Sequence, residues 1–242
     1  MASVPRTTKK KPVIYPTSDG RPMAETDQHR DQMVDLIESL KIRYKPHRKV
    51  YVSGNLVLYY VEGDKRKHLS PDVFLVKGIL NHPRDYYLLW EERKSPNVVF
   101  EIASKSTRNE DLTQKFEIYR DILRVSEYFL FDPFGEYLQP SLKGFRLRNG
   151  QYVPIRPVNG RLPSKVLGLH LERVGVELRL YDPATGEYVP TPRELLAQTE
   201  AARQQAEEAQ REEAAAREKA ETELERLRRE LEALRTRSSP GT

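Results

Sequence analysis

The spacing of apolar residues changes from a helical to an extended pattern within the first sixty positions. Residues 1–25, rich in Pro, Thr and Lys, are expected to form a flexible lead-in. A helix capped by Thr26 or Asp27 should follow and bury a stripe of Met33, Leu36, Ile37 and Leu40. The β-branched and aromatic runs 50–52 and 56–61, separated by a Ser-Gly-Asn turn, predict two strands.

Two further apolar runs predict the centre of a sheet. Residues 71–76 are expected to form a strand that starts at Pro71-Asp72. Residues 97–103 are apolar on both faces except for Glu101, a pattern typical of a buried central strand. The pattern then predicts a helix that begins at Thr107, Asn109 or Asp111 and runs to about residue 121. Its expected inner face consists of Leu112, Phe116 and Tyr119.

The remaining runs add strands and then a different kind of segment. Residues 128–131 predict a strand, and Asn149-Gly150 is a strong turn signal for a hairpin. A second hairpin is expected around 182–186. A helix, several strands, a helix and more strands indicate an α/β (α+β) domain with a central sheet. We expect this domain to span 26–192, with the hairpins at its C-terminal side.

The tail has a composition of its own. Residues 193–237 contain no Gly or Pro and are dominated by Ala, Glu and Arg, so they predict one long helix, before a disordered end at 238–242. Leu224, Leu227, Leu231 and Leu234 recur at spacings of three, four and three, which indicates a short coiled-coil seam. A homodimer through this helix is one expectation, and an isolated charged helix is the alternative.

Charge and cysteine content narrow the chemistry. Residues 193–237 hold 10 of the 41 basic and 12 of the 36 acidic side chains, so the remainder is more basic than the net +5 of the whole chain. This suits a polyanionic partner such as DNA. The chain has no cysteine, which excludes disulfides and thiolate chemistry. The sequence shows neither a membrane span nor a signal peptide, and we expect a cytoplasmic protein without a membrane partner.

Two acidic residues occur in or next to segments that are otherwise apolar. Asp72 lies at the mouth of an apolar strand, and Glu101 lies inside another, where an uncompensated charge is costly. Carboxylates that converge from neighbouring strands suit a hard cation such as Mg²⁺ or Mn²⁺. Such a metal can polarise a phosphodiester and help to deprotonate water. Asp72 and Glu101 are therefore the predicted metal ligands.

An ordered set of segments carries a family resemblance. It consists of Pro71-Asp72, residues 99–107, Asp111-x-x-x-Lys115-x-x-x-Tyr119 and residues 127–133. The set resembles the Uma2 (DUF820) family, a branch of the PD-(D/E)xK restriction-endonuclease-like superfamily. The resemblance covers roughly residues 26–175. It implies a restriction-endonuclease-like core with a central mixed sheet flanked by helices, Mg²⁺ dependence and DNA as substrate.

One position departs from the superfamily pattern. The pattern places a lysine two residues after the acidic residue, where this chain has Ala103. Lys115, on the predicted helix, matches the position associated with the family's helical lysine, and Lys105 is the competitor. We predict Asp72, Glu101 and Lys115 as the catalytic set. Structural interpretations stay open: Asp72 as a turn residue at a strand start, Glu101 as partner of a basic residue, Lys115 in a solvated pair with Asp111, His29 as an ordinary polar residue, and Tyr119 as core.

Three functions follow from these residues. The leading hypothesis is a Mg²⁺-dependent endonuclease that hydrolyses phosphodiester bonds of DNA. The alternative is a module with a decayed site that binds DNA or acts as a scaffold through its helical tail, which the alanine at position 103 favours. Hydrolysis of a nucleotide or another phosphoester is a third hypothesis, because no base-reading element is visible in the sequence.

Overall fold

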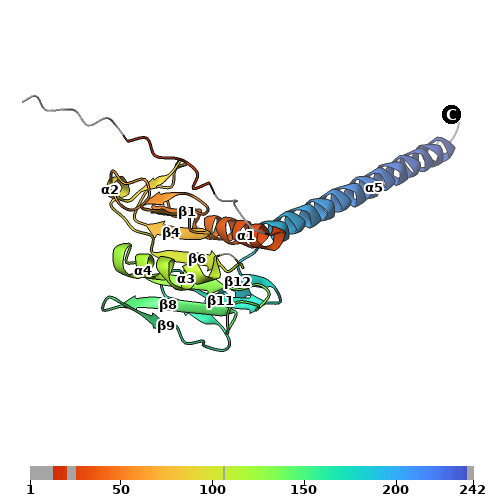
Figure 1. Cartoon of the computed structure of the whole chain (residues 1–242). Coiled ribbons are helices and arrows are strands. Elements are labelled where there is room, and N and C mark those ends of the chain that lie inside the picture. Colours follow the sequence, from red (N-terminus) through yellow and green to blue (C-terminus); the bar gives the residue numbers. More distant parts are fainter. Residues whose placement is uncertain (1–12, 21–25, 106, 239–242) are drawn as a thin grey trace, which may run out of the picture. The chain divides into compact units, whose positions relative to one another are not determined.

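The chain folds into two compact units, Met1–Thr191 and Pro192–Thr242. The computed structural model describes residues 13–20, 26–105 and 107–238 (Figure 1). The sequence predictions of a flexible lead-in over 1–25 and a disordered end over 238–242 fall mostly outside these ranges. Among the described residues, no helix is both long and apolar enough to cross a bilayer.

A six-stranded mixed sheet forms the centre of the first unit. Its strands, in spatial order, are β1 (Val50–Ser53), β4 (Val73–Lys77), β6 (Val98–Ile102), β7 (Glu127–Phe131), β8 (Leu142–Arg148) and β9 (Gln151–Pro154). Only β6 and β7 pair in parallel, and the other neighbours are antiparallel. Every residue of β6 and β7 is buried, as the nearly uninterrupted apolar run around Glu101 predicts. The expected mixed α+β fold is thereby confirmed.

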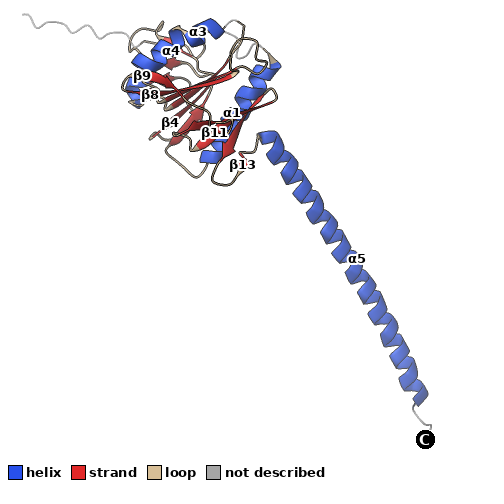
Figure 2. Ribbon diagram, turned by 90° about the horizontal axis from the view of Figure 1, so that it is seen from below, coloured by secondary structure: helices blue, strands red, loops and turns tan. Residues whose placement is uncertain are grey.

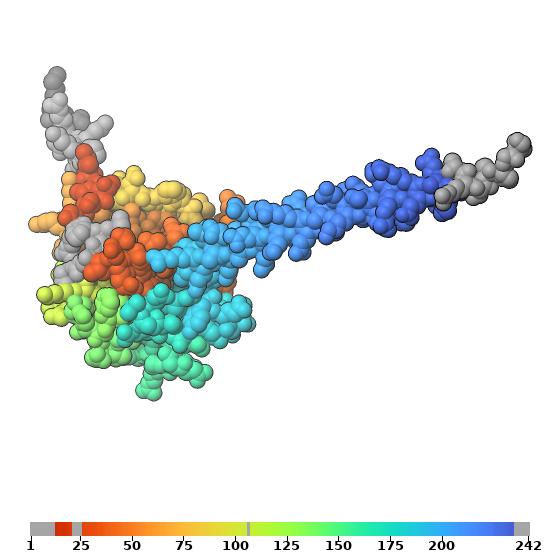
Figure 3. All heavy atoms as spheres, turned by 90° about the vertical axis from the view of Figure 1, so that its right-hand side faces the viewer, coloured from red at the N-terminus to blue at the C-terminus, as the bar shows by residue number. Residues whose placement is uncertain are grey.

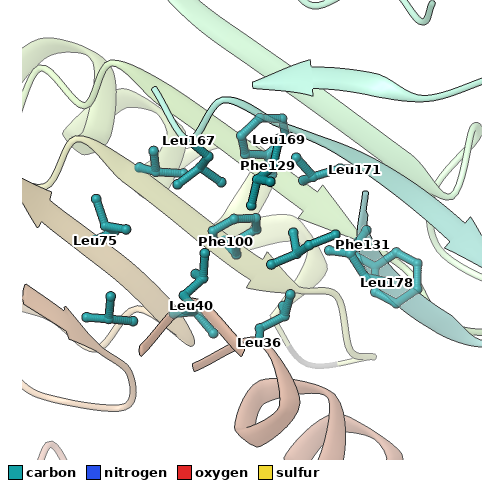
Figure 4. Close-up of a cluster of buried hydrophobic side chains, with 14 of the residues drawn as sticks. Leu36, Leu40, Leu75, Phe100, Phe129, Phe131, Leu167, Leu169, Leu171 and Leu178 are labelled. Atoms are coloured by element: carbon teal, nitrogen blue, oxygen red, sulfur yellow. The ribbon is translucent and has the colours of Figure 1, made fainter. Parts of the chain in front are cut away.

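The first helix covers one face of this sheet. Helix α1 (Asp27–Tyr44) is capped by Thr26, whose Oγ1 accepts a hydrogen bond from the His29 backbone N–H at 3.1 Å. Its apolar stripe packs on inward-facing strand residues, as Figure 4 shows for Leu36, Leu40 and Phe100. The stripe predicted from helical spacing is confirmed, with Ile37 partly buried at its edge.

The crossover between the parallel strands covers the other face. It consists of α3 (Arg108–Leu112), α4 (Gln114–Glu117) and a π-helical turn, η1 (Ile118–Ile122). Tyr119 and Leu123 pack there against apolar residues of β6 and β7. The predicted inner face is wrong at Leu112, which is 38% exposed. The single helix is interrupted at Thr113 (φ −124°, ψ −87°), and the buried stripe runs instead through Asp111, Lys115 and Tyr119.

Two smaller sheets complete the unit. A four-stranded sheet contains β10 (Leu162–Ser164), β11 (Leu169–Val174), β12 (Glu177–Asp182) and β13 (Glu187–Tyr188). Figure 2 shows β11 and β13 of this sheet next to α1, and the buried leucines of the sheet belong to the same core cluster as the stripe on α1. A three-stranded sheet contains β3 (His68–Leu69), β2 (Leu58–Tyr59) and β5 (Tyr87–Leu88), with α2 (Leu89–Glu92) after it. The β8–β9 hairpin turns at Asn149 and Gly150, both with positive φ, as the Asn-Gly pair predicts.

The second unit is the single helix α5 (Pro192–Ser238), which has 47 residues. In the space-filling view of Figure 3 this unit is a narrow blue rod. At 1.5 Å per residue its length is about 70 Å. The predicted long C-terminal helix is confirmed. The helix is strongly polar, but four leucines near its end are 49–63% exposed: Leu224, Leu227, Leu231 and Leu234.

Candidate active site

The two predicted acids lie at the same end of neighbouring strands. The antiparallel register of β4 and β6 pairs Val73 with Phe100, so continuing it by one residue brings Asp72 opposite Glu101. Asp72 Oδ2 accepts a hydrogen bond from the backbone N–H of Ile102 at 2.7 Å. The geometry therefore ties the Asp72 carboxylate to the strand that carries Glu101.

Glu101 is buried against the crossover helices, with 1% of its surface exposed. Lys115 Nζ donates to its Oε2 at 3.0 Å, and the hydroxyl of Tyr119 donates to its Oε1 at 2.5 Å. Burial raises the pKa of Glu101 to about 8, with Lys115 opposing the shift and the charges of Asp72 and Asp111 adding to it. Glu101 is thus a carboxylate whose charge is only partly compensated by its protein partners.

Lys115 lies between two buried acids. Its Nζ is 3.0 Å from Glu101 Oε2 and 2.8 Å from Asp111 Oδ1, and 6% of the residue is exposed. Burial lowers the pKa of Lys115, but the attraction of Glu101, Asp111 and Asp72 outweighs this effect and raises it above the usual value. Lys115 is therefore a buried ammonium. The structural alternative was a solvated Asp111–Lys115 pair; the pair is present, but it is buried.

The competing lysine does not reach this cluster. Strand β6 ends at Ile102, and Lys105 lies in the following turn, where it is exposed. Ala103, at the position where the superfamily pattern has a lysine, packs in the same core as Tyr119, and its backbone N–H donates to Phe131 O at 2.7 Å. The ammonium near Glu101 comes from the crossover helix and not from the strand.

Three participants were not assigned a role in the site from the sequence. His29 Nε2 lies 3.1 Å from Asp72 Oδ2, and His29 is buried. Its position four residues before Met33, on the buried face of α1, is a signal that could have identified it. Asp111 and Tyr119 follow the same rule: they lie four residues before and after Lys115 and share its buried face.

The charges of this cluster fit a divalent cation. Asp72, Glu101 and Asp111 influence one another electrostatically, while Lys115 is the one buried ammonium that the structure describes among them. A buried excess of negative charge favours a bound cation. Within the described ranges, no three His, Asp or Glu side chains are placed to form a complete metal site. Mg²⁺ commonly takes only one or two carboxylates from the protein and keeps water or substrate oxygens as its other ligands, so a site with two carboxylates would be compatible with this ion.

A mixed sheet with acids at adjacent strand ends and a buried lysine beside them agrees with the restriction-endonuclease-like core that the family resemblance implies. The chain belongs to the Uma2 family, described as a putative restriction endonuclease, whose model matches residues 9–192. The resemblance carried by the ordered segments between Pro71 and Pro133 is confirmed.

Among solved structures, the chain is similar to a putative nuclease belonging to DUF820 from Anabaena variabilis ATCC 29413. The two share 15% sequence identity with a TM-score of 0.46, over 62% of this chain and 80% of the other. No curated protein matches the chain.

Proposed function

We propose that the protein is a metal-dependent endonuclease that hydrolyses phosphodiester bonds of DNA and uses Mg²⁺ or Mn²⁺. The observation that carries this proposal is the buried acid–lysine cluster, in which Lys115 Nζ lies 3.0 Å from Glu101 in a chain of the Uma2 family. The excess of basic residues outside the tail supports a polyanionic substrate.

Each residue of the cluster has a role that its contacts support. Asp72 and Glu101 hold the cation, which supplies a Lewis acid for the phosphodiester and for the attacking water. Lys115 offsets negative charge that develops on the phosphoryl oxygens, because its ammonium stays protonated between two acids. Tyr119 and His29 are positioning residues: Tyr119 donates to Glu101, and His29 contacts Asp72.

The test is incubation of the purified full chain with supercoiled plasmid and with duplex oligonucleotides. We expect nicked or linear products with Mg²⁺ or Mn²⁺ and none with EDTA. The matched protein control is Asp72→Asn, purified identically, which removes one carboxylate and should be inactive. Cleavage that persists in EDTA, or in Asp72→Asn at the parental rate, contradicts the metal-site assignment.

A DNA-binding or scaffold module with a decayed site is the second candidate. It is favoured by Ala103 and by the commitment of both Glu101 oxygens to Lys115 and Tyr119. This candidate predicts that the chain binds DNA with the same affinity in EDTA and in Mg²⁺ and leaves it intact at any metal concentration. Stoichiometric Mg²⁺ or Mn²⁺ binding that Glu101→Gln abolishes would contradict it.

A further inference from the structure

The end of α5 carries an apolar seam that its own helix cannot bury. Leu224, Leu227 and Leu231 line a shallow groove together with Arg228 and Glu232, and each of these leucines is about half exposed. Leu234 continues the seam and is 63% exposed. Spacings of three and four repeat every seven residues, which is the pattern that buries such a seam against another helix of the same kind.

The charges beside the seam distinguish between the two orientations of a helix pair. With Leu224 and Leu231 at the first apolar position of each heptad, Glu223 and Arg228 fall on the flanking positions that face each other across a parallel pair. Glu223 of one copy then meets Arg228 of the other, twice per dimer. In the antiparallel pair that aligns the four leucines, Arg228 would face Arg228 and Glu230 would face Glu230, both unfavourable.

Among the described residues of α5, the ion pairs involve Glu223 but not Arg228. Arg226 lies 2.7 Å from Glu223 and 3.9 Å from Glu230, and Arg229 lies 3.6 Å from Glu225. In the described part of the helix, no intrahelical ion pair is formed by Arg228, which flanks the leucines. An arginine at this position is available to a second helix.

We propose that residues 220–234 of α5 form a parallel two-stranded coiled coil with a second copy of this chain. The occupant of the seam is the same seam of another molecule, because the flanking charges are self-complementary in the parallel arrangement. Since each α5 follows directly on Thr191, a parallel coil attaches two copies of the first unit at the same end. This inference does not depend on the proposed nuclease activity.

The absence of cysteine from the chain permits a clean test of orientation. Ala220 continues the seam by one step toward the N-terminus, so Ala220→Cys places two thiols opposite each other only in a parallel pair. Ala215→Cys, on the outer face, is the matched control. We expect oxidation of the full-length variants to give at least about tenfold more disulfide-linked dimer for Ala220→Cys than for Ala215→Cys. Equal, low yields from both variants overturn the parallel arrangement.

Sedimentation equilibrium of the full chain tests the interface itself. At high micromolar concentration the parent should approach twice the 28.2 kDa of one chain, and Leu227→Asp with Leu231→Asp should return it to the monomer mass. Arg228→Glu should raise the dimer dissociation constant about tenfold, and adding Glu223→Arg should restore it. A monomeric parent, a dimer that survives the leucine substitutions, or indifference to Arg228→Glu each overturns the proposal.

Discussion

Two glutamates on neighbouring strands are equally buried but differ in how their charge is compensated. Glu127, at the start of β7, is 1% exposed and accepts hydrogen bonds from the Arg146 guanidinium (2.8 Å) and the Ser164 hydroxyl. It also accepts hydrogen bonds from the backbone N–H groups of Lys165 (3.0 Å) and Val166 (3.3 Å). Glu101, toward the end of β6, is also 1% exposed but has two donors, Lys115 and Tyr119. The parallel register places the two glutamates at opposite ends of their strands.

The two glutamates also differ in the groups that surround them. Four donors from β8 and from the segment around β10 converge on Glu127, so this carboxylate joins the central sheet to the four-stranded sheet. Glu101 faces further acids, Asp72 and Asp111, and shares its lysine with Asp111. A buried carboxylate with a complete set of donors stabilises a fold, whereas one among like charges is suited to a ligand that brings positive charge.

The largest expected effect separates the two glutamates by activity. Glu101→Gln should reduce DNA cleavage at least about 10³-fold, because it removes a proposed metal ligand and a charge from the proposed site. Its melting temperature should stay near or above that of the parent, since burial of a charge is relieved. Plasmid nicking with Mg²⁺ and thermal melting of the same preparations measure both. A stable Glu101→Gln variant that cuts at the parental rate would remove Glu101 from the site.

Glu127→Gln should behave in the opposite way. The substitution leaves the partly buried Arg146 guanidinium beside a neutral group, so we expect a loss of about 3 kcal/mol in the free energy of unfolding. Cleavage per folded molecule should remain close to that of the parent, because Glu127 lies at the far end of the strands. Denaturant unfolding monitored by circular dichroism, combined with the nicking assay below the unfolding transition, provides the measurement. Full stability with lost cleavage would reverse the assignment of the two roles.

The third prediction concerns the lysine that Glu101 shares with Asp111. Lys115→Met should lower the cleavage rate about 10²-fold, an amount typical of losing one group that stabilises charge in the transition state. DNA binding in Ca²⁺ should persist, as measured by fluorescence anisotropy. Lys105→Met is the matched control and should cleave normally, because Lys105 is exposed in the turn after β6. A fully active Lys115→Met beside an inactive Lys105→Met would show that the helical lysine is structural.

The smallest expected effect is a pH dependence of stability without metal. Folding raises the pKa of the Glu101 carboxyl from an ordinary value near 4.5 to about 8. The protonated carboxyl therefore contributes its full stabilisation of the fold below pH 4.5, and this contribution is lost as the pH rises to about 8. Relative to the parent, Glu101→Gln should therefore gain at least about 1 kcal/mol between pH 5 and pH 8. Melting curves in EDTA across this range test the sign, and parallel pH profiles for the two proteins would contradict the raised pKa.

The features that the sequence predicts are those in which one physical rule dominates. The stripe on α1 follows from helical periodicity, and the β8–β9 turn follows from the ease with which Asn149 and Gly150 adopt positive φ. Glu101 was identifiable because a charge inside an apolar strand requires a partner. These signals depend on neighbours in sequence and can be recognised without the fold.

The features that the sequence does not predict depend on contacts between segments that are distant in sequence. Asp111 and Lys115 have side chains that normally face water, so periodicity assigned the inner face to Leu112 instead. Burial of this pair is stabilised by Glu101, fourteen residues away from Lys115 on another element. The donors to Glu127 lie 19 to 39 residues away in sequence, and no local pattern predicts them.

The ammonium beside Glu101 comes from Lys115 on the crossover helix, and this location affects how relatives of this protein can be recognised. A search template that demands a lysine two positions after the strand glutamate would pass over this chain, because Ala103 occupies that position. A three-dimensional template could instead require one cation within hydrogen-bond distance of the glutamate, whichever element supplies it. Such a template would accept this chain through Lys115. Chains with an intact strand acid and no strand lysine should therefore be inspected for a helical substitute before they are classed as inactive.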